Sequence, residues 1–227
     1  VITPEINGRN LDTEGAKKAI LDSLNNGGSV ELPIVETKAE FTTESFARMN
    51  GIIGQFTSNY GSSVKNRKEN IKLAAKKLNG LLVLPGEQIS FNQTVGDISA
   101  STGYLPAGVI INGEFDTGIG GGICQVSTTM YNALVRADIQ IDERRNHSRP
   151  VNYVPLGTDC AVASGYLDLK FTNSFDFPIY ITTEADNSSI TFYVLGDKNT
   201  KDYDIDIVSE RVEVIKSKVV ETPSSAL

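Results

Sequence analysis

The sequence predicts an α+β fold in which a few helices pack on a mostly antiparallel sheet. Three observations lead to this prediction. Apolar residues at helical spacing dominate the earlier part of the chain, strand-like alternation dominates the later part, and short turn sequences separate the later strands. A composition with 40% hydrophobic and 22% charged residues is ordinary for a folded globular protein.

Three helices are expected from apolar residues that recur at helical spacing. Asp12 or Thr13 can cap the first, a second runs from about residue 63 to 79, and a third begins at about Cys124. The buried face of the third helix is formed by Val126, Met130, Ala133, Leu134 and Ala137. The cysteine is therefore expected at the N-terminus of a buried amphipathic helix.

Strands are expected where β-branched and aromatic residues alternate or cluster. An edge strand interrupted by Pro33 covers residues 30–35, and a buried strand covers residues 81–84. Later strands are expected at residues 139–141, 151–154, 166–172, 179–183 and 190–195. Residues 92–123 are rich in Gly, Ser and Asp, so we expect mostly loops there.

The chain is expected to hold one complete domain with two incomplete flanks. Residues 1–40 carry a single helix and are too few for a separate core, so they are expected to belong to another domain. The main domain covers residues 41–208, and residues 209–227 form a linker or the start of a further module. No run has the length of a membrane span. Because the sequence starts in mid-pattern, the lack of a signal peptide does not argue against export.

Charge and residue types exclude several classes of partner. A net charge of −7 without a basic stripe argues against nucleic acid, and an acidic chain binds membrane surfaces poorly. One histidine and two distant cysteines cannot form a familiar zinc site. No EF-hand loop occurs, which leaves only a calcium site made of carboxylates as an alternative. The residue types therefore argue against a zinc protein.

The segment Gly120-Gly121-Gly122-Ile123-Cys124 combines a nucleophile with groups that stabilise negative charge. Glycine allows close backbone approach and positive φ, and the first N–H groups of a helix carry a partial positive charge. A thiol in such a place ionises readily and reacts as the thiolate, and the N–H groups can receive an oxyanion. The spacing predicts Cys124 as the nucleophile of an acyl transfer.

His147, the sole histidine, follows Cys124 in an order typical of cysteine enzymes that place the base on a strand after the nucleophile helix. A third group must orient this base, and Asp159 and Asp168 are the candidates. A hairpin between the strand after His147 and the strand that carries Asp168 favours Asp168. A looped-out connection would remove that preference and leave Asp159 as the alternative.

Plainer interpretations stand beside this one. Most cysteines are buried and inert, and a lone histidine is usually structural. Cys160 is interpreted as a small buried residue, but a disulfide between Cys124 and Cys160 would silence the site.

Three arginines, Arg144, Arg145 and Arg149, flank His147 and form either a solvated face or a carboxylate-binding cluster. Arg149 is the one expected at the substrate, because it lies two residues from His147 and shares a face of the expected strand with it. The structural alternative is an ion pair between Arg149 and a nearby acid.

An ordered series of motifs resembles the VanW family from about Phe56 to Asn173. Its most specific part is GGGICQ at residues 120–125, with Ser127-Thr128-Thr129 and Tyr131-Asn132. The other blocks are Arg67 with Asn70, residues 84–87 with 90–92, 103–104, 147–148, 153–155, Gly157 with Asp159, and 168–169 with Phe171. Cys160 departs from the family, which usually carries alanine at that position.

The resemblance implies an L,D-transpeptidase, a thiol acyltransferase that acts on peptidoglycan stem peptides and needs no cofactor. Cys124 would attack the third residue of a tetrapeptide stem, release D-alanine and pass the acyl group to an amine of a neighbouring stem. Together with Arg149, the substrate-binding residues are expected to be Tyr104, Gly121, Gly122, Gln125 and Ser127.

The resemblance also implies a place outside the cytoplasm and a link to glycopeptide resistance. Residues 1–40 resemble the tail of a peptidoglycan-binding domain, and residues 209–227 resemble the start of a five-glycine wall-binding module. Both flanks imply a cell-wall protein or a membrane-anchored ectodomain of a Gram-positive envelope, with any anchor outside this chain. Two other functions fit the same residues: hydrolysis with water as acceptor, and a non-catalytic module that binds a stem carboxylate at the helix N-terminus.

Overall fold

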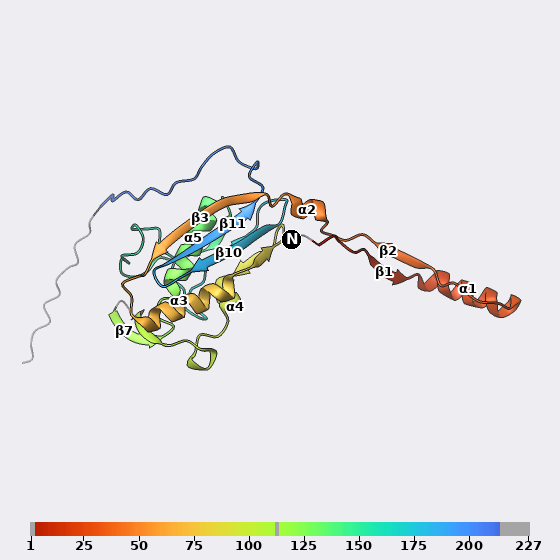
Figure 1. The fold of residues 1–227 in the computed structure, drawn as a ribbon, viewed down its shortest axis with the longest axis horizontal. Helices are drawn as coiled ribbons and strands as arrows, with labels where there is room; N and C mark the ends of the chain where they lie inside the picture. Colours follow the sequence, from red (N-terminus) through yellow and green to blue (C-terminus); the bar gives the residue numbers. More distant parts are fainter. Residues whose placement is uncertain (1–2, 112–113, 214–227) are drawn as a thin grey trace, which may run out of the picture.

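The computed structural model describes residues 3–111 and 114–213, and its helices and antiparallel sheets confirm the α+β class. The largest sheet has the order β3-β11-β10-β4, with every neighbouring pair antiparallel (Figure 1). Its strands are β3 (Gly51–Asn59), β11 (Ser189–Gly196), β10 (Ile179–Ala185) and β4 (Leu81–Val83). Alternate residues of β11 are buried, so one face of the sheet carries the core.

Two helices cover the buried face of this sheet. Helix α5 (Ile123–Arg136) packs along β3 and β11, and α3 (Lys65–Leu78) packs against β10 and against α5. Both ends of α3 and the start of α5 agree with the prediction to within two residues. Apolar residues at helical spacing thus identified the two helices that build the core.

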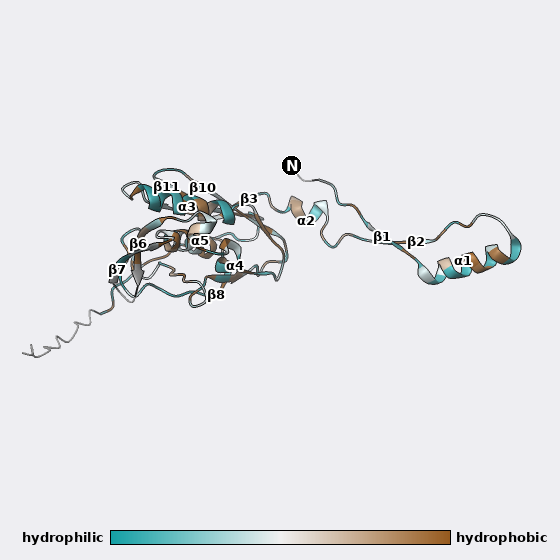
Figure 2. Cartoon of the chain, turned by 90° about the horizontal axis from the view of Figure 1, so that it is seen from below, coloured by the Kyte–Doolittle hydropathy of each residue, from teal (hydrophilic) through white to brown (hydrophobic). Residues whose placement is uncertain are grey.

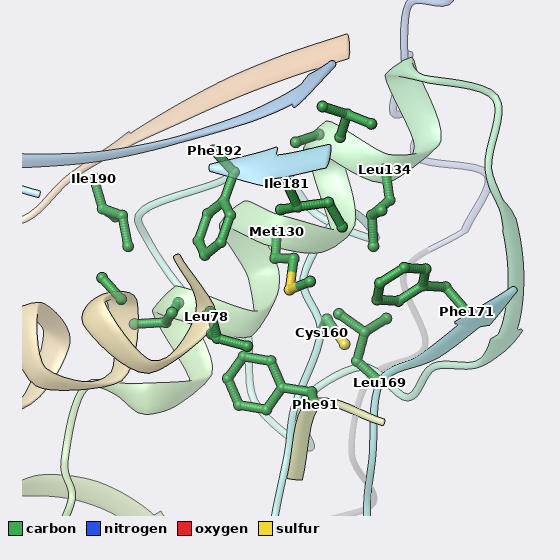
Figure 3. Close-up of a cluster of buried hydrophobic side chains, with 14 of the residues drawn as sticks. Leu78, Phe91, Met130, Leu134, Cys160, Leu169, Phe171, Ile181, Ile190 and Phe192 are labelled. Atoms are coloured by element: carbon green, nitrogen blue, oxygen red, sulfur yellow. The ribbon is translucent and has the colours of Figure 1, made fainter. Parts of the chain in front are cut away.

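Helix α5 is enclosed on its other side by a second, three-stranded sheet. This sheet has the order β5-β9-β8 and consists of β5 (Gln88–Ser90), β9 (Lys170–Thr172) and β8 (Gln140–Glu143). Figure 3 shows Ile181 and Phe192 on one side of Met130, with Leu169 and Phe171 on the other. Ten residues of α5 are buried, which makes it the centre of the fold.

Several buried residues of α5 are polar, and hydrogen bonds to β3 satisfy those near its start. Gln125 donates through Nε2 to the hydroxyl of Ser58 at 3.0 Å and to the carbonyl of Asn59 at 3.0 Å. The hydroxyls of Ser58 and Thr129 are 2.7 Å apart. These bonds fix the rotation of α5 about its axis, because a buried polar group without a partner is costly.

The segment between the two long helices is more ordered than its composition predicts. Within the stretch expected to be loops lie α4 (Phe91–Val95), the 3₁₀ turn at Ala100–Thr102, and a hairpin of β6 (Pro106–Ile111) and β7 (Glu114–Ile119). Residues 151–154, expected as a strand, form no strand. Prolines at 150 and 155 bracket them and remove two backbone donors that a ladder would need.

Near the N-terminus, β1 (Gly8–Leu11), α1 (Thr13–Asn26) and β2 (Ile34–Thr37) form an arm that extends from the body (Figure 1). Asp12 caps α1 by accepting from the backbone N–H of Gly15 at 3.0 Å, which decides between the two predicted caps. Figure 2 shows apolar residues along α1, and Ile20, Leu21 and Leu24 are exposed. A short helix α2 (Thr43–Ala47) leads into the body.

The end of the described chain runs without helix or strand. Residues 208–213 form no strand, and residues 214–227, the rest of the expected linker or further module, lie outside the described part. Among the described residues, no helix combines the length and apolar character needed to cross a bilayer.

Gly54→Ala tests the close contact of β3 with α5. A Cβ at Gly54 would lie 2.4 Å from the backbone nitrogen of Ala137 and 2.6 Å from the carbonyl oxygen of Ala133. Because both neighbours are backbone atoms, we expect Gly54→Ala to lower the free energy of unfolding by about 1–3 kcal/mol, as overpacking does. Gly108→Ala is the matched control, since a Cβ there meets nothing within 4 Å. Urea unfolding measures both, and equal effects would contradict this account of Gly54.

Candidate functional site

The glycines before α5 are required by the local geometry. Gly120 and Gly122 have φ of 81° and 113°, which L side chains rarely adopt, and Gly122 is the N-cap residue of α5. A Cβ at Gly121 would lie 2.5 Å from the carbonyl oxygen of Gly108. The turn therefore lies tightly against β6 and leaves Cys124, the second residue of α5, half-buried.

A buried side chain of α3 holds this turn in place. Asn70 donates through Nδ2 to the carbonyl of Gly121 at 3.0 Å and to the carbonyl of Leu105 at 2.9 Å. Its Oδ1 accepts from the N–H of Leu105 at 2.8 Å, and the residue is fully buried. Asn70 thus joins α3, the start of β6 and the first turn of α5. Sequence reasoning noted Asn70 as part of a family motif without assigning this role.

Cys124, His147 and Asp159 lie together in that order of contact. The Cys124 thiol donates to the carbonyl of Val162 at 3.4 Å and is within hydrogen-bonding reach of the imidazole of His147. On the far side of the ring, Nδ1 of His147 lies 2.5 Å from Oδ2 of Asp159. The same carboxylate oxygen accepts from the backbone N–H of His147 at 2.7 Å. Asp159 therefore fixes both the backbone and the ring orientation of His147.

The charges of this group favour the protonated imidazole. Burial of the ring opposes charging, but hydrogen bonding and charge interaction with Cys124 and with Asp159 outweigh burial and raise the pKa of His147. The side chains of His147 and Asp159 are only 8% and 9% exposed, so water screens their interaction little. The arrangement supports transfer of the thiol proton to the imidazole.

Arg144 holds Asp159 in place. Its Nε donates to the backbone carbonyl of Asp159 at 2.7 Å, and one Nη donates to the carbonyl of Gly157 at 2.7 Å and to Oδ1 of Asp159 at 3.5 Å. The guanidinium also lies over the ring of Tyr131, 5.2 Å from its centre. Of the three arginines near His147, Arg144 is thus the one engaged in the site, with a positioning role.

The backbone around Asp159 is tied to α5 by side chains of that helix. The hydroxyl of Thr128 accepts from the N–H of Cys160 at 2.9 Å and is 3.2 Å from the carbonyl oxygen of the same residue. Ser127 donates to that carbonyl at 2.7 Å, and Asn132 donates to the carbonyl of Thr158 at 2.7 Å. Residues 158–160 are therefore fastened alongside the helix that begins at the thiol.

Two predicted substrate contacts are corrected by these bonds. Ser127 is fully buried and its hydroxyl is used by Cys160, while Gln125 is 1% exposed and its amide is used by β3. A third correction concerns Tyr104, which is 1% exposed in the core. Burial raises the pKa of Tyr104 to about 12, and its hydroxyl has no hydrogen-bond partner. These three side chains support the fold and do not face a substrate.

The prediction that Asp168 orients His147 was wrong. Asp168 accepts from the hydroxyl of Ser90 at 2.5 Å and from the backbone N–H of Asn92 at 3.0 Å, so it holds the start of α4. The expected hairpin does not exist. The strand after Asp168 pairs with β8, where Ile141 lies opposite Phe171, so the residues after His147 stay outside the sheet.

Arg149 is exposed, and within the described ranges it forms neither a hydrogen bond nor an ion pair. Its contact with a substrate stays a prediction.

Cys160 is fully buried in the core, where burial raises the pKa of its thiol to about 12, which agrees with its interpretation as a small buried residue. Both cysteines are free thiols, so no disulfide joins Cys124 to Cys160.

Two further polar side chains lie beside the thiol, and no spacing pattern of the sequence had singled them out for the site. Burial raises the pKa of the Tyr153 hydroxyl, and the neighbouring Thr128 lowers it by less. Arg67 of α3 lies near both Tyr153 and Cys124, and burial lowers the pKa of its guanidinium although these two groups favour its charge. Within residues 3–111 and 114–213, no group of three or more His, Cys, Asp or Glu side chains is suited to a metal ion.

Comparison with known proteins identifies relatives of this chain. The family described as VanW like protein matches residues 66–195, which is more than half of the chain. YoaR of Bacillus subtilis, described as uncharacterized, is 36% identical over 187 residues, covering 82% of this chain and 59% of that protein. The vancomycin B-type resistance protein VanW of Enterococcus faecalis is 34% identical over 139 residues, covering 59% of this chain and 50% of that protein.

The chain therefore spans between 50% and 59% of the length of these two relatives. No solved structure matches it.

Asp159→Asn tests which carboxylate acts on His147. Because Asp159 contributes to raising the pKa of His147, we expect the titration midpoint of the imidazole to move to lower pH in Asp159→Asn. Asp168→Asn is the matched control, since Asp168 is equally buried but bonds Ser90 and Asn92 instead. The chain has a single histidine, so one NMR signal reports the titration. An equal shift in both variants would contradict the assignment.

Proposed function

The chain belongs to the VanW family, and on that premise we propose that it is a peptidoglycan L,D-transpeptidase with Cys124 as its nucleophile. The observation that carries this proposal is the contact order Cys124, His147, Asp159 at the start of α5. A thiol, a base and an acid in this order are the parts that thiol acyl transfer needs.

In the proposed acylation step His147 removes the thiol proton. Asp159 engages Nδ1, so Nε2 is the ring nitrogen left for the thiol of Cys124. The thiolate attacks the carbonyl carbon of the third residue of a tetrapeptide stem. The oxyanion is stabilised by the positive end of α5 and by the backbone N–H of Cys124, which donates to no group in the described part of the chain, whereas those of Ile123 and Gln125 donate to Gly120 and Gly122. The peptide C–N bond then breaks as His147 returns the proton to the leaving amine, which releases D-alanine and forms a thioester.

In the second step an amine of a neighbouring stem attacks the thioester. The new amide C–N bond forms, the C–S bond breaks, and His147 takes the proton that the amine loses while Cys124 leaves as the thiolate. Asp159 stabilises the imidazolium in both steps, since it faces the ring throughout. The cycle needs only stem peptides, with no metal or cofactor.

The relatives support a role in the cell wall. The Enterococcus faecalis relative is described as a vancomycin B-type resistance protein, and we carry the cell-wall role implied by that description to this chain. Accordingly, we place the protein outside the cytoplasm, in the cell wall or on a membrane-anchored ectodomain. In this proposal residues 41–208 form the catalytic domain, and residues 1–40 and 209–227 belong to neighbouring wall-binding modules.

Hydrolysis is the second candidate function, because the same thioester reacts with water wherever the acceptor stem is absent. The thiol and imidazole serve both reactions, so only the product distinguishes them. A purely binding role is less favoured, since it gives no reason for an acid to orient the sole histidine beside the thiol.

The proposal predicts that Cys124→Ala abolishes turnover of purified tetrapeptide muropeptides. The wild type should show a mass increase of one stem acyl group on the intact protein, followed by cross-linked dimers and free D-alanine. Shortened stems without dimers would indicate hydrolysis. Because Cys124 is half-buried and its sulfur makes only weak polar contacts, with the carbonyl of Val162 and with His147, the variant should keep a normal melting curve. Dimers formed at the wild-type rate by folded Cys124→Ala would refute the nucleophile.

Asp159→Asn should reduce the acylation rate by about 100-fold or more, because the base loses the charge that orients it and stabilises its protonated form. Asp168→Asn should leave the rate per folded molecule within about twofold of the wild type, because the Asp168 carboxylate bonds Ser90 and Asn92 at the start of α4. Acylation is followed by intact-protein mass spectrometry. A larger loss in Asp168→Asn would refute the assignment of the acid.

A further inference from the structure

Arg67 lies beside the thiol with most of its guanidinium unused. Its side chain runs over the glycine turn: a Cβ at Gly122 would lie 3.0 Å from Cγ of Arg67. Its Nη1 donates to the hydroxyl of Ser63 at 2.9 Å, and no other hydrogen bond of the guanidinium occurs in the described part of the chain. The absence of a side chain at Gly122 thus leaves space for the Arg67 side chain of α3 to lie against the start of α5.

No carboxylate neutralises this arginine. Within residues 3–111 and 114–213, Arg67 takes part in no ion pair, and the ionisable groups that act on it are Tyr153, Cys124 and Tyr60. The residue is half-buried, and burial lowers the pKa of its guanidinium. A partly desolvated cation with free donors binds an anion well, because a carboxylate matches its fork with two parallel hydrogen bonds.

The other arginine of the site differs in this respect. Arg144 directs its donors to Gly157 and Asp159, so its guanidinium is committed within the protein. Arg67 approaches Cys124 from α3, a different element from the segment that carries His147 and Asp159. The thiol therefore has His147 on one side, from the segment that also carries Asp159, and the guanidinium of Arg67 from α3.

We propose that Arg67 binds the free carboxylate of the residue that leaves, so that the site acts on the last peptide bond of a chain. This inference rests on the proposed acyl transfer at Cys124. In a C-terminal residue the carboxylate follows the scissile bond within one residue, about 3.6 Å along the chain. A cation beside the nucleophile is therefore placed to bind it while the thiolate attacks.

This role sets the class of substrate. A tetrapeptide stem with a free C-terminal carboxylate satisfies Arg67, whereas a C-terminal amide removes the charge, and an added fifth residue moves it one residue further away. Both changes leave the half-buried guanidinium of Arg67 without a partner. Because an unpaired buried charge is costly, we expect the site to discriminate strongly against both altered peptides. Arg67 then selects for a residue that ends in a free carboxylate.

The test compares a stem tetrapeptide with its C-terminal amide. In the wild type we expect kcat/KM for acylation, measured by intact-protein mass spectrometry, to be about 10- to 100-fold higher for the free acid than for the amide. This is the size of effect that the loss of a hydrogen bond to a charged group has. Arg67→Gln should reduce the efficiency for the acid to that for the amide and leave the amide unchanged. The preference of Arg67→Lys for the acid should lie between those of the wild type and Arg67→Gln, because lysine keeps the charge and cannot form two parallel hydrogen bonds with a carboxylate. Lys65→Gln, an exposed residue of the same helix, is the charge-matched control and should keep the wild-type preference.

An equal loss for acid and amide in Arg67→Gln would overturn the inference, and would show that Arg67 acts on the thiolate or the oxyanion. A binding measurement separates this from failure of the proposed function. In a Cys124→Ala background, calorimetry should show tighter binding of the acid than of the amide, and Arg67→Gln should remove the difference. If that preference appears without acylation in the wild type, the carboxylate site stands and the transpeptidase proposal falls. If neither binding nor acylation distinguishes the two peptides, Arg67 is not a carboxylate site.

Discussion

The candidate site depends on one pair of hydrogen bonds, between the hydroxyl of Thr128 and the backbone of Cys160. Thr128 lies one turn after Cys124 on α5, so these bonds fasten residues 158–160 to the helix that carries the thiol. Asp159 lies between the fastened carbonyls, and it fixes both the ring and the backbone of His147. The thiol, the imidazole and the carboxylate are therefore all held in place by one helix, although a strand and a long irregular segment separate Cys124 from His147 and Asp159 in sequence.

This dependence explains why the most buried helix carries so many polar residues. Ser127, Thr128 and Asn132 are each at most 1% exposed, and each donates to the backbone of residues 158–160. An apolar replacement would leave the backbone groups of that segment unsatisfied, at about 1–3 kcal/mol each. Without a sheet to hold residues 144–163, these side chains take over the role that ladder hydrogen bonds have elsewhere, and Arg144 supports the same segment from outside.

Local patterns predicted the helices well because helix formation depends on neighbours within a few residues. The apolar face of α3 and the position of Cys124 at a helix start followed from such patterns, and the cap of α1 was narrowed to Asp12 or Thr13. The choice between Asp159 and Asp168 failed because it required knowing which strands pair, and β9 pairs with β8 instead of with residues after His147. Arg67 was not identified as a site residue for a similar reason, since its place beside Cys124 arises only when α3 packs on α5.

The Asn70 bridge has a consequence for how the protein acquires its geometry. Its partners Leu105 and Gly121 lie 35 and 51 residues away along the chain, and it contacts both through buried hydrogen bonds. Bringing such distant segments together costs loop-closure entropy before their contacts can offset it. A growing or partly folded chain therefore carries Cys124 without the turn that positions it. The turn that carries the thiol is therefore complete only when α3, the segment before β6 and the start of α5 have come together.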